Sequence, residues 1–202
     1  MTNTPASLVN EFMGCANIFM FAANEVFEER LLKQAAGGEL TASQVRLLRL
    51  VSLTDAQTIG DVAAFLGISN AAASKAVDKL VRRGLLLRKE GEADRRSIHL
   101  SLTDLGRGLL NSYETARQSK LEEVFGKVET ADLQKGAELL KRLSALIVGR
   151  TSKPEEICLQ CGMYFPERCL LQELEGRNCH YSQRRSRRDA DNARTVTESA
   201  PR

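Results

Sequence analysis

Several residue types that often reveal a protein's chemistry are scarce in this sequence. Its 202 residues include no tryptophan, two histidines, three tyrosines and four prolines. The histidines, His99 and His180, stand far apart and neither belongs to a nucleophile–base motif, so we do not expect an enzyme. The formal net charge is only +3, so an argument for nucleic acid must rest on where the basic residues lie.

Long hydrophobic runs are also missing. No apolar stretch approaches the length of about 20 residues that a membrane span needs, and the first residues do not form a basic region followed by an apolar core. We therefore expect a cytoplasmic protein with no membrane partner. In the reducing cytoplasm, clustered cysteines are more often metal ligands or redox-active thiols than structural disulfides.

In contrast, residues 40–102 carry a well-marked pattern of short helices. Thr41, Thr58 and Ser69 each stand just before an amphipathic segment, where a hydroxyl can accept a hydrogen bond from a free backbone N–H and start a helix. The inner face of the second segment is expected to hold Ile59, Val62, Ala63 and Leu66. Gly67 ends this segment, because glycine takes the left-handed conformation at little cost. The turn before the third helix is therefore only a few residues long, as a helix-turn-helix requires.

The third predicted helix, from Asn70 to about Arg83, has one apolar face and one polar, basic face. Three alanines at its start leave a slim end that can approach base edges, and the Lys and Arg side chains further along can bind phosphates. A merely solvated amphipathic helix is the alternative, but the short preceding turn and the hairpin that follows favour DNA. The candidate DNA-binding residues here are Ser69, Asn70, Ser74, Lys75, Lys79 and Arg82.

A β-hairpin is expected directly after this helix. Residues 85–89 and 97–101 are predicted to form two short strands, the second alternating polar and apolar residues. The turn between them is charged and contains Asp94, Arg95 and Arg96. Arginine at a hairpin tip can insert into the minor groove, where the potential is most negative. These three residues therefore join the candidate DNA-binding set.

Over roughly residues 8–148, the chain resembles the MarR family of bacterial transcription regulators. The wing signature of that family is matched by Asp94, Arg96, Leu102, Thr103 and Gly106. The resemblance implies a winged helix-turn-helix in which Asp94 orients Arg95 or Arg96 toward DNA. It also implies a homodimer that binds a pseudo-palindromic site, and a small-molecule effector pocket lined by scattered apolar residues.

Long helices are expected on both sides of the winged helix. Apolar residues recur in steps of three and four from Leu8 to about Gln34, on more than one face, and Thr103 and Thr130 are expected to cap two further helices. The residues expected to face inward on the last helix are Leu133, Ala137, Leu140, Leu143 and Ile147. The resemblance implies that the first and last helices interlock across the dimer. Cys15 has no tyrosine or positive charge nearby, so we expect a small buried core residue, with a redox switch as the alternative.

The last part of the chain is rich in cysteine. Its candidate metal ligands are Cys158, Cys161, Cys169 and Cys179, with His180 as an alternative to Cys179. The C-x2-C-G turn can place two thiolates on one metal, and so few apolar residues separate the cysteines that a metal would have to replace the core of this module. Zinc is the preferred cofactor and an iron–sulfur cluster the alternative, while disulfides or free thiols would need no metal.

The predicted fold is therefore mostly α with a small β wing (α+β). Its parts are an N-terminal dimerisation helix (1–39), a winged helix-turn-helix DNA-binding domain (40–102), C-terminal dimerisation helices (103–150), a cysteine-rich metal-binding module (151–182) and a disordered basic and polar tail (183–202). In this tail, Arg184, Arg185, Arg187 and Arg188 either contact DNA phosphates or remain solvated.

The predicted function is a homodimeric regulator of transcription that binds double-stranded DNA sequence-specifically and acts as a repressor. The alternative is a protein-interaction scaffold, in which the winged helix is retained as a core and the cysteine-rich segment docks a partner. The sequence does not indicate the operator, the controlled genes or the effector.

Overall fold

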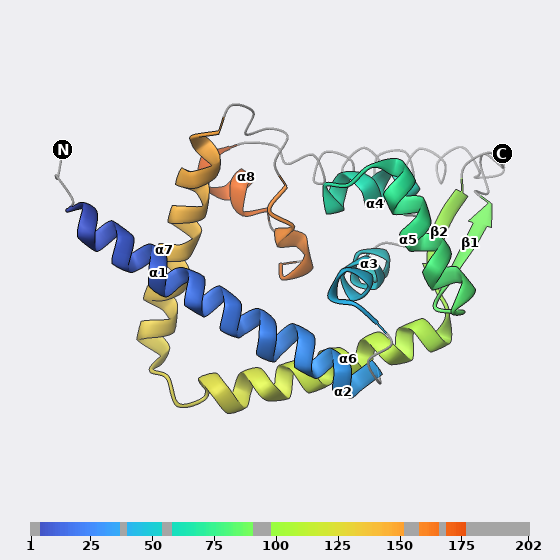
Figure 1. Cartoon of the computed structure of the whole chain (residues 1–202), viewed down its shortest axis with the longest axis horizontal. Helices are drawn as coiled ribbons and strands as arrows, with labels where there is room; N and C mark the ends of the chain where they lie inside the picture. The colour runs from blue at the N-terminus through green and yellow to red at the C-terminus, as the bar shows by residue number, and fades with distance from the viewer. Residues whose placement is uncertain are drawn as a thin grey trace, which may run out of the picture.

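Figure 1 shows a computed structural model of the chain, in which residues 5–36, 40–53, 58–90, 98–151, 158–165 and 169–176 are described. In chain order the elements are α1 (Ala6–Ala23), a π-helical segment η1 (Asn24–Arg30), α2 (Leu31–Ala36), α3 (Ala42–Ser52), α4 (Ile59–Leu66), α5 (Asn70–Arg82), β1 (Leu86–Glu90), β2 (Ile98–Leu102), α6 (Asp104–Phe125), α7 (Thr130–Gly149), a short 3₁₀ helix η3 (Cys161–Met163) and α8 (Leu170–Glu175). The described part is mostly helical with one two-stranded antiparallel sheet, which confirms the predicted fold class.

The winged-helix lobe consists of α3, α4, α5 and the β1–β2 hairpin, gathered at one end of the molecule (Figure 1). The hydroxyl of Thr41 accepts a hydrogen bond from the backbone N–H of Gln44, whose side chain accepts one from the N–H of Thr41. Thr58 and Asp61 form the same reciprocal pair at the start of α4. Gly67 ends α4 in the left-handed conformation, with φ 66°. The helix starts and the short turn predicted from sequence are therefore confirmed.

The core of this lobe is almost entirely aliphatic. The largest fully buried side chains are Phe65, Leu47, Leu48, Leu50, Leu80, Leu85, Leu86, Leu100, Val51, Val62 and Val77. The burial of Phe65 was not predicted from the sequence. The apolar pattern had placed Leu66 on the inner face of α4, but Leu66 is only partly buried. A helix of eight residues is too short for its apolar period to separate two adjacent positions.

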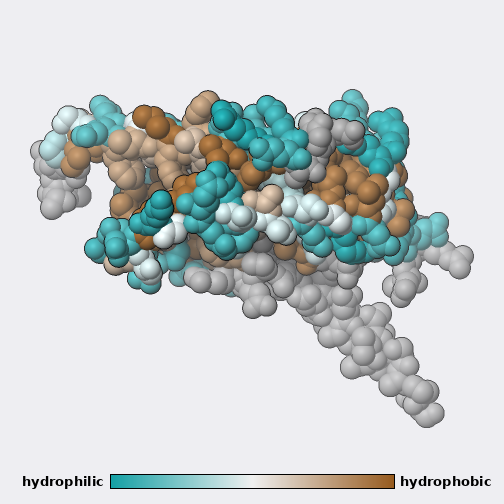
Figure 2. Space-filling view, turned by 90° about the horizontal axis from the view of Figure 1, so that it is seen from below, coloured by the Kyte–Doolittle hydropathy of each residue, from teal (hydrophilic) through white to brown (hydrophobic). Residues whose placement is uncertain are grey.

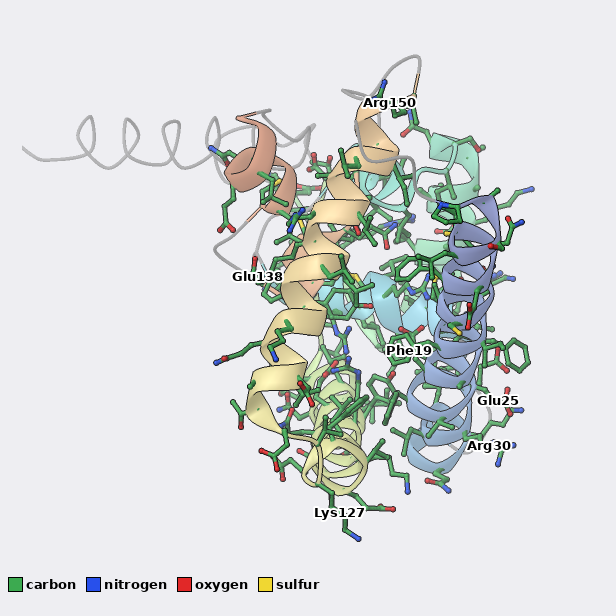
Figure 3. All side chains as sticks on the ribbon, turned by 90° about the vertical axis from the view of Figure 1, so that its left-hand side faces the viewer. Phe19, Glu25, Arg30, Lys127, Glu138 and Arg150 are labelled. Atoms are coloured by element: carbon green, nitrogen blue, oxygen red, sulfur yellow. The ribbon has the colours of Figure 1, made fainter. Side chains whose placement is uncertain are left out.

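The N-terminal helices lie outside this core in the single chain. No residue of α1 is buried, and among its exposed apolar side chains are Ile18 (71% exposed) and Phe21 (75%). Cys15 is exposed as well, so the expectation of a buried core cysteine is wrong for one chain taken alone. The physical reason is that nothing in the described part covers α1. Figure 3 shows α1 and α7 as two separate columns, with the ion pair of Glu25 and Arg30 on the outer side of the N-terminal helix.

The N-terminal helix also corrects the expectation that no segment could span a membrane. In the described part, one helix, Ala6–Gln34, is long and apolar enough to cross a membrane by length and composition, with a mean hydropathy of 1.3. The expectation rested on the lack of an unbroken apolar run, whereas α1 is apolar on more than one face with isolated polar residues between. A helix whose apolar surface is covered by another protein surface passes the same test, so this is weak support for a membrane.

Two long helices follow the wing. Thr103 caps α6 as predicted, with its hydroxyl accepting from the N–H of Gly106. At α7 the predicted cap is wrong, because Thr130 is already the first helical residue and Glu129 before it makes no side-chain cap. The buried residues of α7 are Ala145 and Val148, while Leu133, Leu140 and Ile147, which were expected to face inward, are exposed. In one chain, α7 thus presents an apolar face without a neighbour.

Candidate nucleic-acid interface

The exposed face of α5 carries the candidate DNA-binding residues. Ala73, Val77 and Leu80 are fully buried against the lobe, which fixes the opposite face outward. That outward face contains Ser69, Asn70, Lys75, Lys79 and Arg82, all exposed, and Ser74, half-buried. Ser69 caps the helix by accepting from the N–H of Ala72 at 3.2 Å. The structure therefore leaves five of the six candidates exposed and Ser74 half-buried, and their contact with DNA stays a prediction.

An ion pair with the hairpin neutralises the one acidic residue of α5. The guanidinium of Arg88 on β1 lies 2.6 Å from a carboxylate oxygen of Asp78. Because Asp78 is paired, the cations of Lys75, Lys79 and Arg82 dominate the charge of this helix. This role of Arg88 has no local signal in the sequence, because its partner lies 10 residues away across a turn. Its pairing also joins the start of the hairpin to α5.

The hairpin has the predicted antiparallel form. Leu86 pairs with Leu102, Arg88 with Leu100 and Glu90 with Ile98. Leu86, Leu100 and Leu102 are buried, whereas the β1 residues after Leu86 are exposed. The predicted wing-tip residues Asp94, Arg95 and Arg96 fall between residues 90 and 98 and lie outside the described residues.

The remaining signature residues form a joint between the lobe and α6. The hydroxyl of Thr103 donates to the carbonyl oxygen of Gly84 at 2.6 Å while it accepts from Gly106 N–H at 2.9 Å. A Cβ on Gly106 would lie 2.2 Å from the carbonyl oxygen of Leu85. Only glycine allows this approach, so Thr103 and Gly106 hold the end of α5, the wing and α6 together.

A polar cluster connects the lobe with the helices that leave it. The guanidinium of Arg49 on α3 is buried and forms an ion pair with Glu114 of α6. Arg46 on α3 pairs with Glu28 of η1 at 2.8 Å. The hydroxyl of Tyr113 donates to the carbonyl oxygen of Phe27 at 3.0 Å. Burial, together with the nearby negative charge of Glu28, raises the pKa of Tyr113 to about 12.

The cysteine-rich segment is described only in part. Cys161 is buried, while Cys158 and Cys169 are half-buried. The sulfur of Cys158 accepts a hydrogen bond from the backbone N–H of Gln160 at 3.4 Å, and such a donor stabilises a thiolate. Among the described residues, no three Cys, His, Asp or Glu side chains are grouped closely enough to hold a metal ion. The predicted ligand Cys179 lies outside the described residues, as do His180 and the arginine-rich tail.

Comparison with known sequences agrees with this geometry. The sequence profile of the MarR family matches residues 40–98. The HTH-type transcriptional regulator MhqR of Bacillus subtilis is 30% identical over 87 residues, which cover 43% of this chain and 58% of that protein. The transcriptional repressor MprA of Escherichia coli is 28% identical over 78 residues, 39% of this chain and 44% of that protein. This chain thus matches about half the length of these curated relatives. Both relatives are regulators rather than enzymes, in agreement with the sequence analysis.

Solved structures extend the similarity to the flanking helices. The transcriptional repressor CouR, bound to a 23-mer DNA duplex, is 26% identical, with 72% of this chain and 99% of that chain covered and a TM-score of 0.53. Staphylococcus aureus MarR, in complex with salicylate and kanamycin, reaches a TM-score of 0.62 at 16% identity and covers 72% of this chain and 96% of that chain. Both structures share the fold, and each leaves more than a quarter of this chain unmatched.

Proposed function

We propose that this chain, whose residues 40–98 form a MarR-family domain, is a transcription regulator that binds double-stranded DNA sequence-specifically. The observation that carries the proposal is the outward face of α5. It combines short polar groups at the helix start, suited to base edges, with Lys75, Lys79 and Arg82 for phosphates. Since Asp78 is neutralised by Arg88, this face carries no unpaired carboxylate that would repel DNA.

The regulator we propose is a homodimer. Exposed apolar side chains on α1 and α7 support this, since a soluble protein rarely leaves so many uncovered. They are Leu8, Val9, Phe12, Met13, Ile18, Phe19, Met20 and Phe21 on α1, and Leu133, Leu139, Leu140, Leu146 and Ile147 on α7. On the face in Figure 2, apolar surface is visible toward the N-terminal end. A two-fold dimer would present two α5 helices to successive major grooves of a pseudo-palindrome.

In this proposal the protein is cytoplasmic and represses by occupying promoter DNA. A small-molecule effector would shift the dimer to a geometry in which the two α5 helices no longer match successive grooves. The curated relative MprA is named as a repressor, which supports this direction of control.

Charge-removing substitutions on α5 test DNA binding. A duplex is first selected by the unmodified chain from a random pool, and its affinity for Lys79→Ala and Arg82→Ala is then measured over a series of salt concentrations. Each variant is expected to bind more weakly and to lower the dependence of log affinity on log salt by about 1. Lys127→Ala, at the exposed turn between α6 and α7, is the matched control and should bind as the unmodified chain does.

The same experiment separates the two function classes. Equal affinity and equal salt dependence in all three variants would mean that α5 does not contact DNA. That result would favour the protein-interaction scaffold. Arg96→Ala, at the wing tip, extends the comparison to the minor groove, where loss of an inserted arginine should weaken binding.

We further propose that Cys158, Cys161, Cys169 and Cys179 bind zinc, with an iron–sulfur cluster as the alternative. Support comes from the four thiols in one short segment and from the N–H of Gln160 at the sulfur of Cys158. Metal content and the visible spectrum of protein purified without oxygen test this. A colourless protein with about one zinc per chain supports zinc, brown protein with iron and acid-labile sulfide supports the cluster, and no metal contradicts both.

A further inference from the structure

The cysteine-rich segment returns to the winged-helix lobe and contributes to its core. Met163 is 7% exposed and belongs to the same apolar cluster as the buried side chains of α3, α4 and α5. Cys161 is 6% exposed, and Cys158 packs against the edge of the cluster. Met163 therefore joins the core of the lobe, and Cys158 packs against that core.

Polar and aromatic contacts tie the same segment to three helices. The side-chain amide of Gln160 donates to the carbonyl oxygen of Phe65 on α4 at 3.1 Å. The ring of Tyr164 contacts two guanidinium groups, with its centroid 5.9 Å from Arg49 of α3 and 5.8 Å from Arg117 of α6. Such cation–π contacts are favourable, and here they join α3 and α6 through one ring.

The other end of the segment contacts a different part of the fold. The helix α8 packs against α7, the long helix farthest from the wing (Figure 1). Residues 158–165 and 169–176, hereafter the C-terminal strap, therefore connect the winged-helix lobe at one end with α7 at the other.

We propose that the C-terminal strap controls DNA affinity from within the chain, by holding the winged-helix lobe in its DNA-binding position relative to α6 and α7. This inference rests on the proposed function, because DNA is the ligand whose affinity the strap would control. A dimer that must fit two successive grooves binds more tightly when the placement of each lobe is fixed beforehand. With the strap undocked, Arg49 and Arg117 lose their contacts with the Tyr164 ring and Met163 leaves the core. The lobe is then held by its contacts with α6 and the N-terminal helix.

Substitution of Met163 in the full chain tests the strap. Met163→Glu places a carboxylate in an apolar site and should expel the strap, whereas Met163→Leu keeps size and polarity and is the matched control. Tyr164→Ala is a second variant that removes the contact with both arginines and takes no buried side chain from the core, since this ring is half exposed.

Three measurements are made on each variant. A chelator first removes any bound metal, which would itself protect a cysteine ligand, and mass spectrometry then follows alkylation of Cys161 by iodoacetamide. The rate reports docking because this thiol is buried. Hydrogen exchange of the backbone amides of α3, α4 and α5, in the absence of DNA, measures how often the lobe opens. The affinity of each variant for the duplex selected by the unmodified chain measures the effect on DNA binding. In Met163→Glu, alkylation of Cys161 should be about tenfold faster, the affinity for DNA about tenfold lower, and hydrogen exchange in the lobe faster. Tyr164→Ala should change all three quantities in the same direction, whereas Met163→Leu should leave them unchanged.

Two results would overturn the proposal. Unchanged alkylation of Cys161 in Met163→Glu and Tyr164→Ala would mean that the strap is not docked as described. Faster alkylation with unchanged exchange and unchanged DNA affinity would mean that docking does not control the lobe. If the unmodified chain selects no DNA, the proposed function fails, while alkylation and exchange still decide whether the strap docks and orders the lobe.

Discussion

The hydroxyl of Tyr113 donates a hydrogen bond to the carbonyl oxygen of Phe27, 86 residues earlier in the chain, at 3.0 Å. This bond joins α6 to the π-helical segment η1, close to the stacked rings of Phe27 and Phe125, whose centroids are 6.0 Å apart. It lies beside the ion pairs that link α3 to η1 and α6. Tyr113 thus helps to fix the position of the N-terminal helix on α6.

Removal of this hydroxyl should cost stability and change its dependence on alkaline pH. At neutral pH, Tyr113→Phe leaves the Phe27 carbonyl without this donor and should lower the free energy of unfolding by about 1 kcal/mol. The pKa of Tyr113 is about 12 in the folded chain because burial disfavours the phenolate, and about 10 in the unfolded chain. The stabilisation from this shift is therefore present below about pH 10 and is lost as pH rises through about 12.

Urea unfolding at about pH 9 and about pH 11 measures the effect, since the unfolded tyrosine titrates between these values. The unmodified chain should lose about 1 kcal/mol more stability between them than Tyr113→Phe does. The difference between the two proteins removes the contribution of other groups that titrate in this range. Parallel pH profiles would contradict the buried position of Tyr113.

Two glycines in the first turns of α6 should respond oppositely to alanine. In Gly106→Ala the new Cβ would lie 2.2 Å from the Leu85 carbonyl oxygen, a backbone atom that cannot turn away. We expect a loss of about 2 kcal/mol or more in the free energy of unfolding. Gly108 has nothing within 4 Å of such a Cβ, so Gly108→Ala should gain about 0.5–1 kcal/mol from helix propensity. Similar effects of the two substitutions on the thermal midpoint would contradict the joint at Gly106.

The N-terminal cap of α6 should also contribute to the stability of the fold. Thr103→Ala removes both the hydrogen bond to the Gly84 carbonyl and the acceptor for Gly106 N–H. A loss of about 1–2 kcal/mol in unfolding free energy is expected, the upper part of the range for helix caps. Thr103→Ser keeps the hydroxyl and is the control that should retain most of the stability. If serine destabilised as much as alanine, the hydrogen bonds would not be the reason for threonine here.

A charge on the exposed face of α1 should separate the two subunits. Phe21 is 75% exposed in one chain, and Phe21→Glu is expected to convert dimer to monomer in sedimentation velocity, because a carboxylate in an apolar interface is costly. Leu105→Glu is the matched control at an exposed leucine of α6, where the dimer should persist. A monomeric unmodified chain that sediments with lipid vesicles would instead assign the apolar surface of α1 to a membrane.

The local chemistry of this sequence was enough to predict the winged-helix lobe. The caps at Thr41, Thr58 and Ser69 and the left-handed Gly67 depend on residues at most three positions apart, so they are visible without a structure. Packing across longer separations was not visible. The pairing of Asp78 with Arg88 and the approach of Gly106 to Leu85 depend on how α5, the wing and α6 meet.

The errors of the sequence analysis have one physical origin at the long helices. The apolar period of α7 identified a hydrophobic face but not its partner, so Leu133, Leu140 and Ile147 were assigned to the interior although they are exposed in one chain. The same holds for Cys15 on α1. In the C-terminal strap, the cysteines drew attention to a metal, and no local pattern indicated that Met163 would enter the core of a lobe 60 or more residues earlier.

Selection of duplexes from a random-sequence pool by the unmodified full chain tests the central claim most directly. A dimeric regulator should enrich an inverted repeat whose half-site centres lie about 10 base pairs apart, one turn of the duplex, because each α5 of a two-fold dimer reads one half-site. Failure to enrich any sequence over the starting pool, or enrichment of one half-site with no symmetric partner, would contradict a dimeric, sequence-specific DNA-binding regulator.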